Sequence, residues 1–475
     1  MVDRQSVREN AQYLREVRPV DPEEIHEYVP GAPHPAVVRR VLREEAADLR
    51  LREREDGTFV PASEEPAPRV EWEPTRFPER YSRAVEDLLV ERYGANWHRG
   101  DSGDELRTAI SRLKSDYFFG NDVRYDEPAA LGYALYHLPD YYAVAGYVLG
   151  DLAERGLLPR TLRVLDVGAG AGGPALGLHD YLPDDAVVDY HAVEPSAAAD
   201  VLKHMLAETG RNFRPTVHRE RAQSVAFEEP FDLVCANNVL GEVDDPVAVA
   251  RDLLDWTAAD GTLLLTAPAD LETSTGLRKV ERALVPAAAT GDDDAPSVYA
   301  PTLRLWPGEA PTDRGWSFDV RPELEPAPFQ TRLEEASAGD ADPGTYIKTS
   351  VQFSYSLVRP DGARRLDARA SPERHAKMAA MDDHVTERVD LLAVKLSHDL
   401  TDEPEANPLF KIGDGSQTVD HYAVVTRASV LNRDLLAAPY GAVVAFENAL
   451  ALWNDDEEAY NLVLDGESVA DVVAV

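Results

Sequence analysis

Cysteine is nearly absent from this sequence, in which Cys235 is the only one among 475 residues. A single thiol excludes a disulfide within the chain. It also excludes sites built from several cysteines, such as zinc ribbons and iron–sulfur clusters. Because Cys235 lies in an apolar run, we expect a small core residue and not a nucleophile. We therefore expect no iron–sulfur cluster and no other metal centre.

Long apolar runs are missing as well. No segment approaches the roughly 20 apolar residues that a membrane-spanning helix needs. The first residues, from Met1 to Gln5, do not begin an apolar signal segment. The sequence therefore predicts a cytoplasmic protein that has no membrane partner.

Basic residues are few relative to acids. Lysine and arginine together number 48, and only seven of them are lysine, against 86 aspartate and glutamate residues, so the formal net charge is −38. Surface acids in such excess repel one another at low salt, and dissolved salt screens this repulsion. Since the acids are spread along the whole chain, we interpret them as an adaptation to a salty cytoplasm, as in halophiles. The alternative is one acidic protein that binds a basic partner.

The length argues for about three domains, and an apolar content of 44% is enough for sizeable cores. Changes in composition and patterning divide the chain into four regions. These are a winged-helix-like module at 1–62, a helical region at 63–157, an α/β domain at 158–362 with an insertion at 281–345, and a small β-rich domain at 363–475.

The first region combines two helix starts with a hairpin. Asp21 caps a helix whose first residue is Pro22, and a second helix starts at His34-Pro35. A hairpin that turns at Asp56-Gly57 follows. Helix, helix and hairpin in this order predict a winged helix-turn-helix.

Two interpretations of this module stay open. It contacts nucleic acid through its basic residues, or it packs or docks against protein. The acids Glu44, Glu45 and Asp48 interrupt the basic residues and favour the second interpretation at least equally. The basic residues in question are Arg39, Arg40, Arg43 and Arg50.

Residues 129–149 form an apolar segment that is rich in tyrosine. Because proline interrupts a helix, the pattern predicts two helices that are broken at Pro139. The tyrosines are either core aromatics or a lid over a cofactor, since the segment leads directly into the α/β domain. We include Tyr142 among the candidate cofactor contacts.

From residue 161 onwards, short apolar runs suited to buried parallel strands alternate with helical segments. The predicted fold class is α/β, with a Rossmann-like sheet, an N-terminal helical or winged-helix region and a C-terminal β-rich domain, for which we expect a small barrel. The insertion at 281–345 is expected to be irregular. The predicted strands are 162–167, 186–193, 216–218, 231–236, 261–266 and 349–358 in the sheet, and 389–396, 421–427, 442–446 and 459–464 after a helix at 372–387.

A glycine-rich turn follows the first of these strands. Gly168, Gly170 and Gly172 allow a tight turn and let a ligand approach the backbone where a Cβ atom would clash. Glu194, twenty-two residues after Gly172, closes the second strand, and its carboxylate can accept both hydroxyls of a ribose. The candidate cofactor contacts at this end of the sheet are Asp166, Gly168, Ala169, Gly170, Gly172, Glu194 and Pro195.

The turn alone fits two kinds of cofactor. Gly168, Gly170 and Gly173 also match the G-x-G-x-x-G pattern of dinucleotide sites, so a nicotinamide, a flavin or a ligand-free turn are alternatives. Three features favour S-adenosylmethionine. The acid Asp166 stands two residues before the first glycine, where methyltransferases commonly carry one near the methionine end of the cofactor. The motif lies mid-chain after a helical region, and the polar segment 237–242 follows the fourth strand.

Methyl transfer from a sulfonium needs an aligned, desolvated acceptor more than it needs acid–base groups. Candidate catalytic residues are therefore few. Asn237, Asn238 and Glu242 can position an acceptor, and Asn237 also counts among the cofactor contacts. Glu242 has the alternative of capping the helix near Pro246. Gln223, after the third strand, is a candidate partner of the adenine.

Several segments resemble, in the same order, the ribosomal small-subunit methyltransferase-like family, whose mitochondrial members assist small-subunit assembly. The segment from Tyr133 to Tyr147 is similar to the one before that family's first glycine motif, and Asn237-Asn-Val-Leu-Gly-Glu-Val243 is similar to its pattern after the fourth strand. The likeness spans about residues 125–360. It continues at Ala267–Asp270, Gly276–Arg278, Arg282–Leu284, Ala300-Pro301, Gly315–Phe318 and Phe353–Tyr355.

The resemblance implies an S-adenosylmethionine-dependent methyltransferase domain at 158–362 that acts on the small ribosomal subunit or its rRNA, in a haloarchaeal type of sequence. Family members often hold an iron–sulfur cluster on cysteines of the insertion, and the matching region, Thr302 to Ser317, contains none. Our leading hypothesis is a methyltransferase-like protein of ribosome assembly. The alternatives are a non-catalytic assembly factor that binds the cofactor, and a small-molecule methyltransferase with accessory domains.

Overall fold

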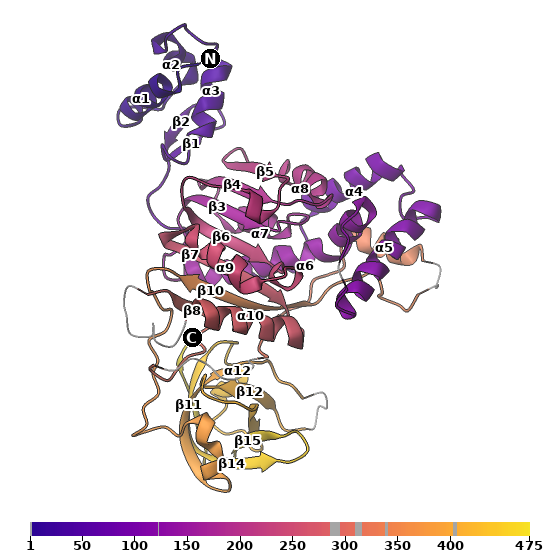
Figure 1. The fold of residues 1–475 in the computed structure, drawn as a ribbon, viewed down its shortest axis with the longest axis vertical. Helices are drawn as coiled ribbons and strands as arrows, with labels where there is room; N and C mark the ends of the chain where they lie inside the picture. Colours follow the sequence, from indigo (N-terminus) through magenta and orange to yellow (C-terminus); the bar gives the residue numbers. More distant parts are fainter. Residues whose placement is uncertain (1, 122, 286–294, 309–315, 338–340, 402–405) are drawn as a thin grey trace. The chain divides into compact units, whose positions relative to one another are not determined.

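The computed structural model describes residues 2–121, 123–285, 295–308, 316–337, 341–401 and 406–475 (Figure 1). Contacts within the chain divide it into two compact units. The first unit comprises residues 1–235 with 322–351, and the second comprises residues 236–321 with 352–475.

The N-terminal module has three helices followed by a two-stranded hairpin. Asp21 caps the second helix, because its carboxylate accepts a hydrogen bond from the amide of Glu23 at 2.9 Å. The hairpin turns at Gly57, whose φ of +81° lies in the left-handed region that favours glycine. The elements are α1 (Arg4–Arg15), α2 (Pro22–Tyr28), α3 (Pro35–Glu44), β1 (Leu51–Glu53) and β2 (Phe59–Pro61).

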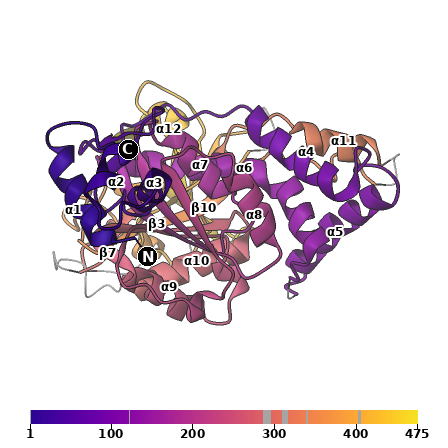
Figure 2. The same cartoon turned by 90° about the horizontal axis from the view of Figure 1, so that it is seen from above.

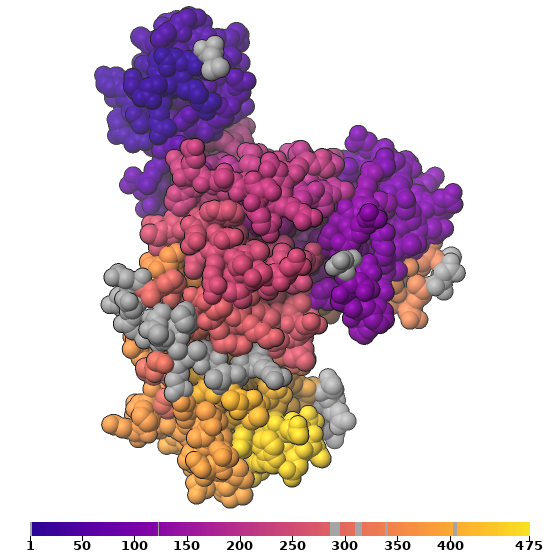
Figure 3. All heavy atoms as spheres, viewed as in Figure 1, coloured from indigo at the N-terminus to yellow at the C-terminus, as the bar shows by residue number. Residues whose placement is uncertain are grey.

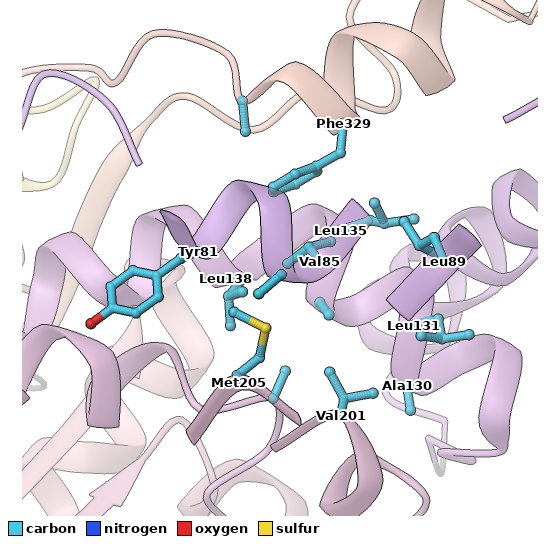
Figure 4. Packing of buried hydrophobic residues seen from close by; sticks show 14 of the residues in the cluster. Tyr81, Val85, Leu89, Ala130, Leu131, Leu135, Leu138, Val201, Met205 and Phe329 are labelled. Atoms are coloured by element: carbon cyan, nitrogen blue, oxygen red, sulfur yellow. The ribbon is translucent and has the colours of Figure 1, made fainter. Parts of the chain in front are cut away.

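Four helices of the first unit form a layer at one side of the sheet, and Figure 2 shows three of them, α4, α5 and α11, gathered together. Their shared core contains Leu135 and Leu138 of α6, Phe329 of α11 and Met205 of α8, all of which are buried (Figure 4). The helices are α4 (Glu79–Tyr93), α5 (Gly100–Phe118), α6 (Glu127–Ala153) and α11 (Pro328–Glu335).

Helix α6 is one continuous helix, so the predicted break at Pro139 is wrong. Proline lacks the N–H that would bond to the carbonyl oxygen of Leu135, four residues earlier. The side-chain amide of Gln330 on α11 donates to that oxygen at 2.9 Å and replaces the missing bond. The helix therefore continues through its proline because a residue from elsewhere in the chain satisfies the carbonyl.

The predicted Rossmann-like sheet is confirmed. By hydrogen bonding its strand order is β5-β4-β3-β6-β7-β10-β8, with β9 paired to β10. Strands β3, β4, β5 and β6 pair in parallel, and β10 runs antiparallel to β7. The strands are β3 (Thr161–Val167), β4 (Val187–Val193), β5 (Phe213–His218), β6 (Phe231–Asn237), β7 (Thr257–Pro268) and β10 (Val351–Arg359); the helices between them are α7 (Gly173–Tyr181), α8 (Ala198–Leu206), α9 (Pro246–Asp255) and α10 (Leu271–Leu284).

The insertion at 281–345 is less irregular than predicted. It contains the strands β8 (Ser297–Ala300) and β9 (Asp319–Arg321) and the helix α11. Apolar side chains in it are buried, among them Tyr299 and Phe329. The acidic run at 291–294 lies outside the described residues.

The C-terminal region is a small barrel, as predicted. Its strands close a ring in the order β11-β12-β13-β15-β14, because β14 pairs with β11 as well as with β15, and β16 adds to β14. The four predicted strands are present, and β12 and β16 were not predicted. The strands are β11 (Arg388–Lys395), β12 (Leu409–Gly413), β13 (His421–Val425), β14 (Val443–Asn454), β15 (Ala459–Leu464) and β16 (Val469–Ala474).

The helix predicted at 372–387 is wrong, since only a short 3-10 segment forms at Met378–His384. The amide of Met378 donates to the carboxylate of Asp414 at 3.0 Å, and the amide of Ala379 donates to the hydroxyl of Ser416 at 3.1 Å. Because barrel side chains accept these amide hydrogens, the segment follows the barrel and does not form i to i−4 bonds.

Candidate functional site

The glycine turn after β3 has the backbone that its sequence predicts. Gly168, Gly170 and Gly172 have φ angles of +71°, +54° and +94°, all in the region that residues with a Cβ atom rarely adopt. The amide of Gly168 donates to the carbonyl of Val193 on β4 at 2.9 Å, and Gly172 is the N-cap of α7. The turn is therefore held against the neighbouring strand and leads directly into a helix.

Side chains from two helices pack against the turn. A Cβ atom on Gly172 would lie 2.8 Å from Leu202 of α8, and one on Gly173 would lie 2.9 Å from the Cβ atom of Tyr141 on α6. These two glycines are required for close packing as much as for ligand access. Gly170 differs, because a Cβ atom there would lie at an ordinary 3.5 Å from the ring of Tyr133. An alanine at Gly170 would therefore be opposed by the positive φ and not by a steric clash.

Glu194 joins the end of β4 to the turn. Its Oε2 atom accepts a hydrogen bond from the amide of Gly170, and its Oε1 atom accepts one from the amide of Ser196, each at 2.9 Å. The side chain is 7% exposed. Each carboxylate oxygen has a second lone pair, so the group can still accept hydroxyl donors from a ribose. The structure brings together the two residues on which the predicted site depends.

Asp166 has a partner that the sequence did not indicate. Its carboxylate is buried and accepts a hydrogen bond from the hydroxyl of Tyr190 on the adjacent strand. Burial, and next the charge of Asp166, raise the pKa of Tyr190 well above its ordinary value, so this hydroxyl stays a donor. Asp166 therefore ties β3 to β4, and its place beside the methionine end of a cofactor stays a prediction.

The remaining predicted contacts of the first unit differ in exposure. Ala169 is buried in the turn, and Pro195 is exposed directly after Glu194. Gln223 is exposed on a short 3-10 turn at Ala222–Ser224, after β5. The role of Gln223 toward an adenine stays a prediction.

The side chain of Tyr142 lies in the helical core, in contrast to the cofactor contact that we predicted. Its ring packs against Phe77 and Trp72, with ring centres 5.5 and 5.3 Å away. Its hydroxyl donates to Asp180 at 3.1 Å. Burial raises the pKa of Tyr142, so the hydroxyl remains a structural donor.

A different face of α6 contacts the turn, and the sequence analysis missed it. Tyr133, His137 and Tyr141 follow one another at intervals of four residues, and the rings of His137 and Tyr141 are stacked at 4.9 Å. The Nδ1 atom of His137 lies 3.4 Å from the carboxylate of Asp140, which is 5% exposed. The four-residue spacing was visible in the sequence and could have separated these rings from Tyr142.

The predicted catalytic candidates belong to the second unit. Asn237 ends β6, and its Oδ1 atom accepts a hydrogen bond from the hydroxyl of Thr266 at 3.3 Å. Asn238 has a φ of +57°, which is unusual for a residue other than glycine, and its amide donates to the carbonyl of Thr266. Glu242 is exposed in a 3-10 turn. Their roles toward an acceptor stay predictions.

The capping role considered for Glu242 is wrong. Helix α9 is capped by Asp245, whose carboxylate accepts a hydrogen bond from the amide of Ala248 at 3.0 Å. An aspartate directly before the proline at the first helical position is the usual arrangement. Capping of α9 therefore does not explain why an acid occupies position 242.

Neither a metal site nor a membrane span is found in the described part of the chain. No group of three or more histidine, cysteine, aspartate or glutamate side chains there could hold a metal ion. Cys235 is buried, and burial raises the pKa of its thiol. No described helix is both long enough and apolar enough to cross a bilayer.

Three parts of the chain match known protein families. Residues 141–325 match the family described as "Methyltransferase domain". Residues 4–55 and 379–473 match the N-terminal and C-terminal domains of one family described as "Domain of unknown function (DUF8157)". No curated protein sequence matches the chain significantly.

Solved structures that resemble the chain include methyltransferases. The sugar N-methyltransferase KedS8 from Streptoalloteichus is 21% identical over 26% of this chain and 47% of its own length, with a TM-score of 0.21. The S-adenosylmethionine-dependent methyltransferase of Methanococcus maripaludis is 14% identical over 31% of this chain and 66% of its own length, with a TM-score of 0.26. The plantazolicin methyltransferase BpumL, solved with SAH, is 9% identical over 59% of this chain and 96% of its own length, with a TM-score of 0.29. The chain spans about half the length of KedS8 and of the CcbJ methyltransferase from Streptomyces caelestis, covering 47% and 49% of them.

Proposed function

We propose that this protein is an S-adenosylmethionine-dependent methyltransferase that acts on the small ribosomal subunit or its rRNA. The proposal that the protein uses S-adenosylmethionine depends on one observation, the hydrogen bond between the carboxylate of Glu194 and the amide of Gly170. This bond supports an acceptor for ribose hydroxyls beside the turn, in which Gly168, Gly170 and Gly172 have no side chain. The domain matched at residues 141–325 is of the class that uses this cofactor.

The residues of the turn fit S-adenosylmethionine in three ways. Glu194 is oriented by two amides and can accept the ribose hydroxyls. Gly170 has no side chain between its backbone and the ring of Tyr133. The first turn of α7, which begins after Gly172, presents the positive end of a helix dipole toward a cofactor carboxylate. When bound, the cofactor supplies a methyl group on a positively charged sulfur.

The chain's own contribution to the reaction is alignment and exclusion of water. The ring of Tyr133 presents a partly negative face, which favours a neighbouring cation. Asn237 is held by Thr266, so its amide has a fixed direction at the end of β6. A fixed amide can orient the acceptor for in-line transfer without moving a proton.

The ribosomal part of the proposal has a different basis. It is supported by the ordered resemblance across about residues 125–360, from Tyr133 to Tyr355. The N-terminal module and the C-terminal barrel, which lie outside the methyltransferase domain, suit an acceptor larger than a metabolite.

Methyl transfer from radiolabelled S-adenosylmethionine tests the acceptor. At high salt, the full chain would be offered small ribosomal subunits, the naked rRNA of that subunit, or a metabolite extract in parallel. We expect label in the subunit or its rRNA. Label only in the metabolite fraction would overturn the ribosomal acceptor, and cofactor binding without label in any fraction would overturn catalysis.

Two glycine variants control this experiment. Gly170→Ala adds a Cβ atom at the cofactor side of the turn, at a φ of +54°. Gly120→Ala adds one at a φ of +64°, where nothing lies within 4 Å. Both variants carry a similar backbone strain of roughly 1–2 kcal/mol. We expect only Gly170→Ala to lose cofactor binding, and equal losses would contradict the placement of the site.

A further inference from the structure

A cleft of about 370 Å³ lies between the hairpin of the N-terminal module and the β4–β5 edge of the sheet. All of its lining residues belong to the first unit, whose N-terminal residues are indigo in Figure 3. The two walls are joined by Asn212. Its side chain accepts a hydrogen bond from the amide of Glu53 at 2.8 Å and donates to the carbonyl of Glu53 at 3.1 Å. Both walls of the cleft are therefore linked by direct hydrogen bonds.

Three arginines line this cleft, and none of them forms an ion pair with a described residue. Arg52 and Arg54 come from β1 and the residue after it, and Arg211 comes from the loop before β5. Arg211 donates one hydrogen bond to the carbonyl of Arg54 at 2.9 Å. The nearby Asp56 has a lowered pKa, chiefly because of its hydrogen bonds with Thr58 and to a smaller extent because of the charge of Arg54.

The acids of the lining do not cancel this charge. Glu53 is 3% exposed and accepts two hydrogen bonds from Arg43, at 2.6 and 2.7 Å, so its charge is already compensated. Glu55 and Asp184 are the other acids of the lining, and both are exposed. Three arginines thus face two exposed carboxylates of the lining, and Asp56 lies near Arg54.

A further cation lies behind the wall. Arg214 on β5 donates to the side chain of Asn212 at 3.4 Å, and its Nε and Nη1 atoms are buried without a hydrogen-bond partner in the described part. Burial lowers the pKa of Arg214 to about 10, so it remains protonated at neutral pH. Its charge is partly offset by the nearby carboxylates of Glu53 and Asp189.

The base of the cleft is apolar. Leu182, Ala186, Val188 and Phe213 line it and are buried, and Pro183 lies at its margin. A volume of this size falls within the range of small-ligand sites. An apolar base beneath guanidinium groups fits a base and sugar with its phosphate, since arginine matches phosphate oxygens with two parallel hydrogen bonds.

The arginines of α3, which the sequence offered for nucleic-acid contact, are paired instead. Arg43 bonds to Glu53, Arg40 lies 3.6 Å from Glu44, and Arg39 lies 4.0 Å from Glu23. The unpaired arginines are on the hairpin side of the module. We therefore place the nucleic-acid contact at the cleft and not on α3.

We propose that this cleft binds a segment of single-stranded RNA, with Arg52, Arg54 and Arg211 on its phosphates. This inference rests on the rRNA acceptor of the proposed function. A single strand fits because the cleft has room for about one nucleotide at a time and cannot take a duplex. The net charge of −38 repels a polyanion at low salt. Since the screening length is about 8–10 Å at moderate ionic strength, only the residues next to the strand then decide binding.

Binding of a fluorescently labelled single-stranded RNA of about 12 nucleotides to the full chain, measured by anisotropy across a salt series, tests this site. The variant Arg52→Gln, Arg54→Gln, Arg211→Gln is compared with Arg69→Gln, Arg83→Gln, Arg92→Gln. The control arginines are exposed and ion-paired, and both variants change the net charge equally.

We expect the cleft variant to lose at least tenfold in affinity. Its plot of log K against log salt should be flatter by about 2, because three phosphate contacts at ~0.7 each are removed. The control variant should bind as the wild type does. A third variant with lysine at the three cleft positions should keep most of the affinity, and equal thermal unfolding of all variants would show that folding is not the cause.

Each other result has a defined meaning. Equal affinity of the cleft and control variants would overturn the cleft while leaving an RNA acceptor in place. No RNA binding by the wild type, with SAH binding intact, would overturn both the cleft and the rRNA acceptor. Displacement of the RNA by an equal concentration of polyglutamate would show a site for any acidic chain, and would also overturn the inference.

Discussion

The side-chain amide of Gln330 donates a hydrogen bond to the carbonyl oxygen of Leu135, the carbonyl that Pro139 leaves without a helical partner. The same amide also lies 3.2 Å from the carbonyl of Tyr136, and Gln330 is fully buried. Helix α6 can therefore run unbroken from the helical layer to the glycine turn. The position of its aromatic face at that turn depends on a residue from α11.

Replacing Gln330 with leucine should destabilise the first unit by about 1–3 kcal/mol, because two buried carbonyls lose a donor. Denaturant unfolding followed by circular dichroism measures this cost. The matched test is the double variant with Pro139→Ala, which supplies an N–H to Leu135. We expect Gln330→Leu to cost less in that background. An equal cost in both backgrounds would show that the amide does not substitute for the proline's missing N–H.

The sequence was sufficient for the parts of the fold that local patterns determine. Buried parallel strands are short apolar runs, and β3, β4 and β6 begin and end within one or two residues of their predicted bounds. The pairing of Gly170 with Glu194 was also predictable, because the turn and the end of the next strand meet at one edge of a parallel sheet.

The rest depended on partners far away in the chain. The sequence predicted a helix break at Pro139, because no residue near it in the chain indicates that Gln330 supplies the missing hydrogen bond. The predicted helix at 372–387 has a helical pattern, yet Asp414 and Ser416 of the barrel accept its amide hydrogens. In the tyrosine-rich helix, the ring of Tyr133 and not that of Tyr142 lies beside the glycine turn. The sequence could not show this, because helical spacing does not say which face of a helix meets the sheet.

Glu194→Gln should weaken SAH binding by about 10–100-fold. Glutamine keeps the shape but has one acceptor oxygen, so it cannot accept from the amides of both Gly170 and Ser196, and a bond to a charged group is worth about 1.5–3 kcal/mol. Isothermal titration calorimetry measures the affinity. Glu208→Gln, an exposed acid beyond α8, is the control and should bind SAH as the wild type does. Unchanged affinity in Glu194→Gln would remove this residue from the site.

Tyr133→Leu should reduce the preference for a charged ligand. The aromatic ring lies beside Gly170, where an added Cβ atom would be 3.5 Å from it, and an aromatic face attracts a sulfonium but not a thioether. The ratio of Kd values for SAH and S-adenosylmethionine should therefore fall by about 2–30-fold, the equivalent of 0.5–2 kcal/mol. Tyr147→Leu, on the same helix beyond His137, is the control. If both ligands weaken by the same factor, the ring contributes shape and not charge recognition.

A buried lysine makes the stability of the barrel depend on pH. Lys395 is 3% exposed, and its ammonium group donates to the carbonyls of Leu435 and Ala438 at 2.9 and 2.7 Å. Burial lowers its pKa from 10.5 to about 8. Between these two values the unfolded chain binds a proton that the folded chain has lost, so this group makes stability rise with pH across that window.

Lys395→Met should remove this rise. We expect the free energy of unfolding of the wild-type barrel, relative to the variant, to increase from about pH 8 to pH 10.5, the two ends set by the lowered and ordinary pKa values. Urea titrations read by hydrogen–deuterium exchange of β11 and β14 peptides measure it within the full chain. Lys279→Met, an exposed lysine on α10, should leave the wild-type dependence in place. If the difference between wild type and Lys395→Met is constant across the window, the ammonium group keeps its ordinary pKa, and its two carbonyl partners outweigh the cost of burial.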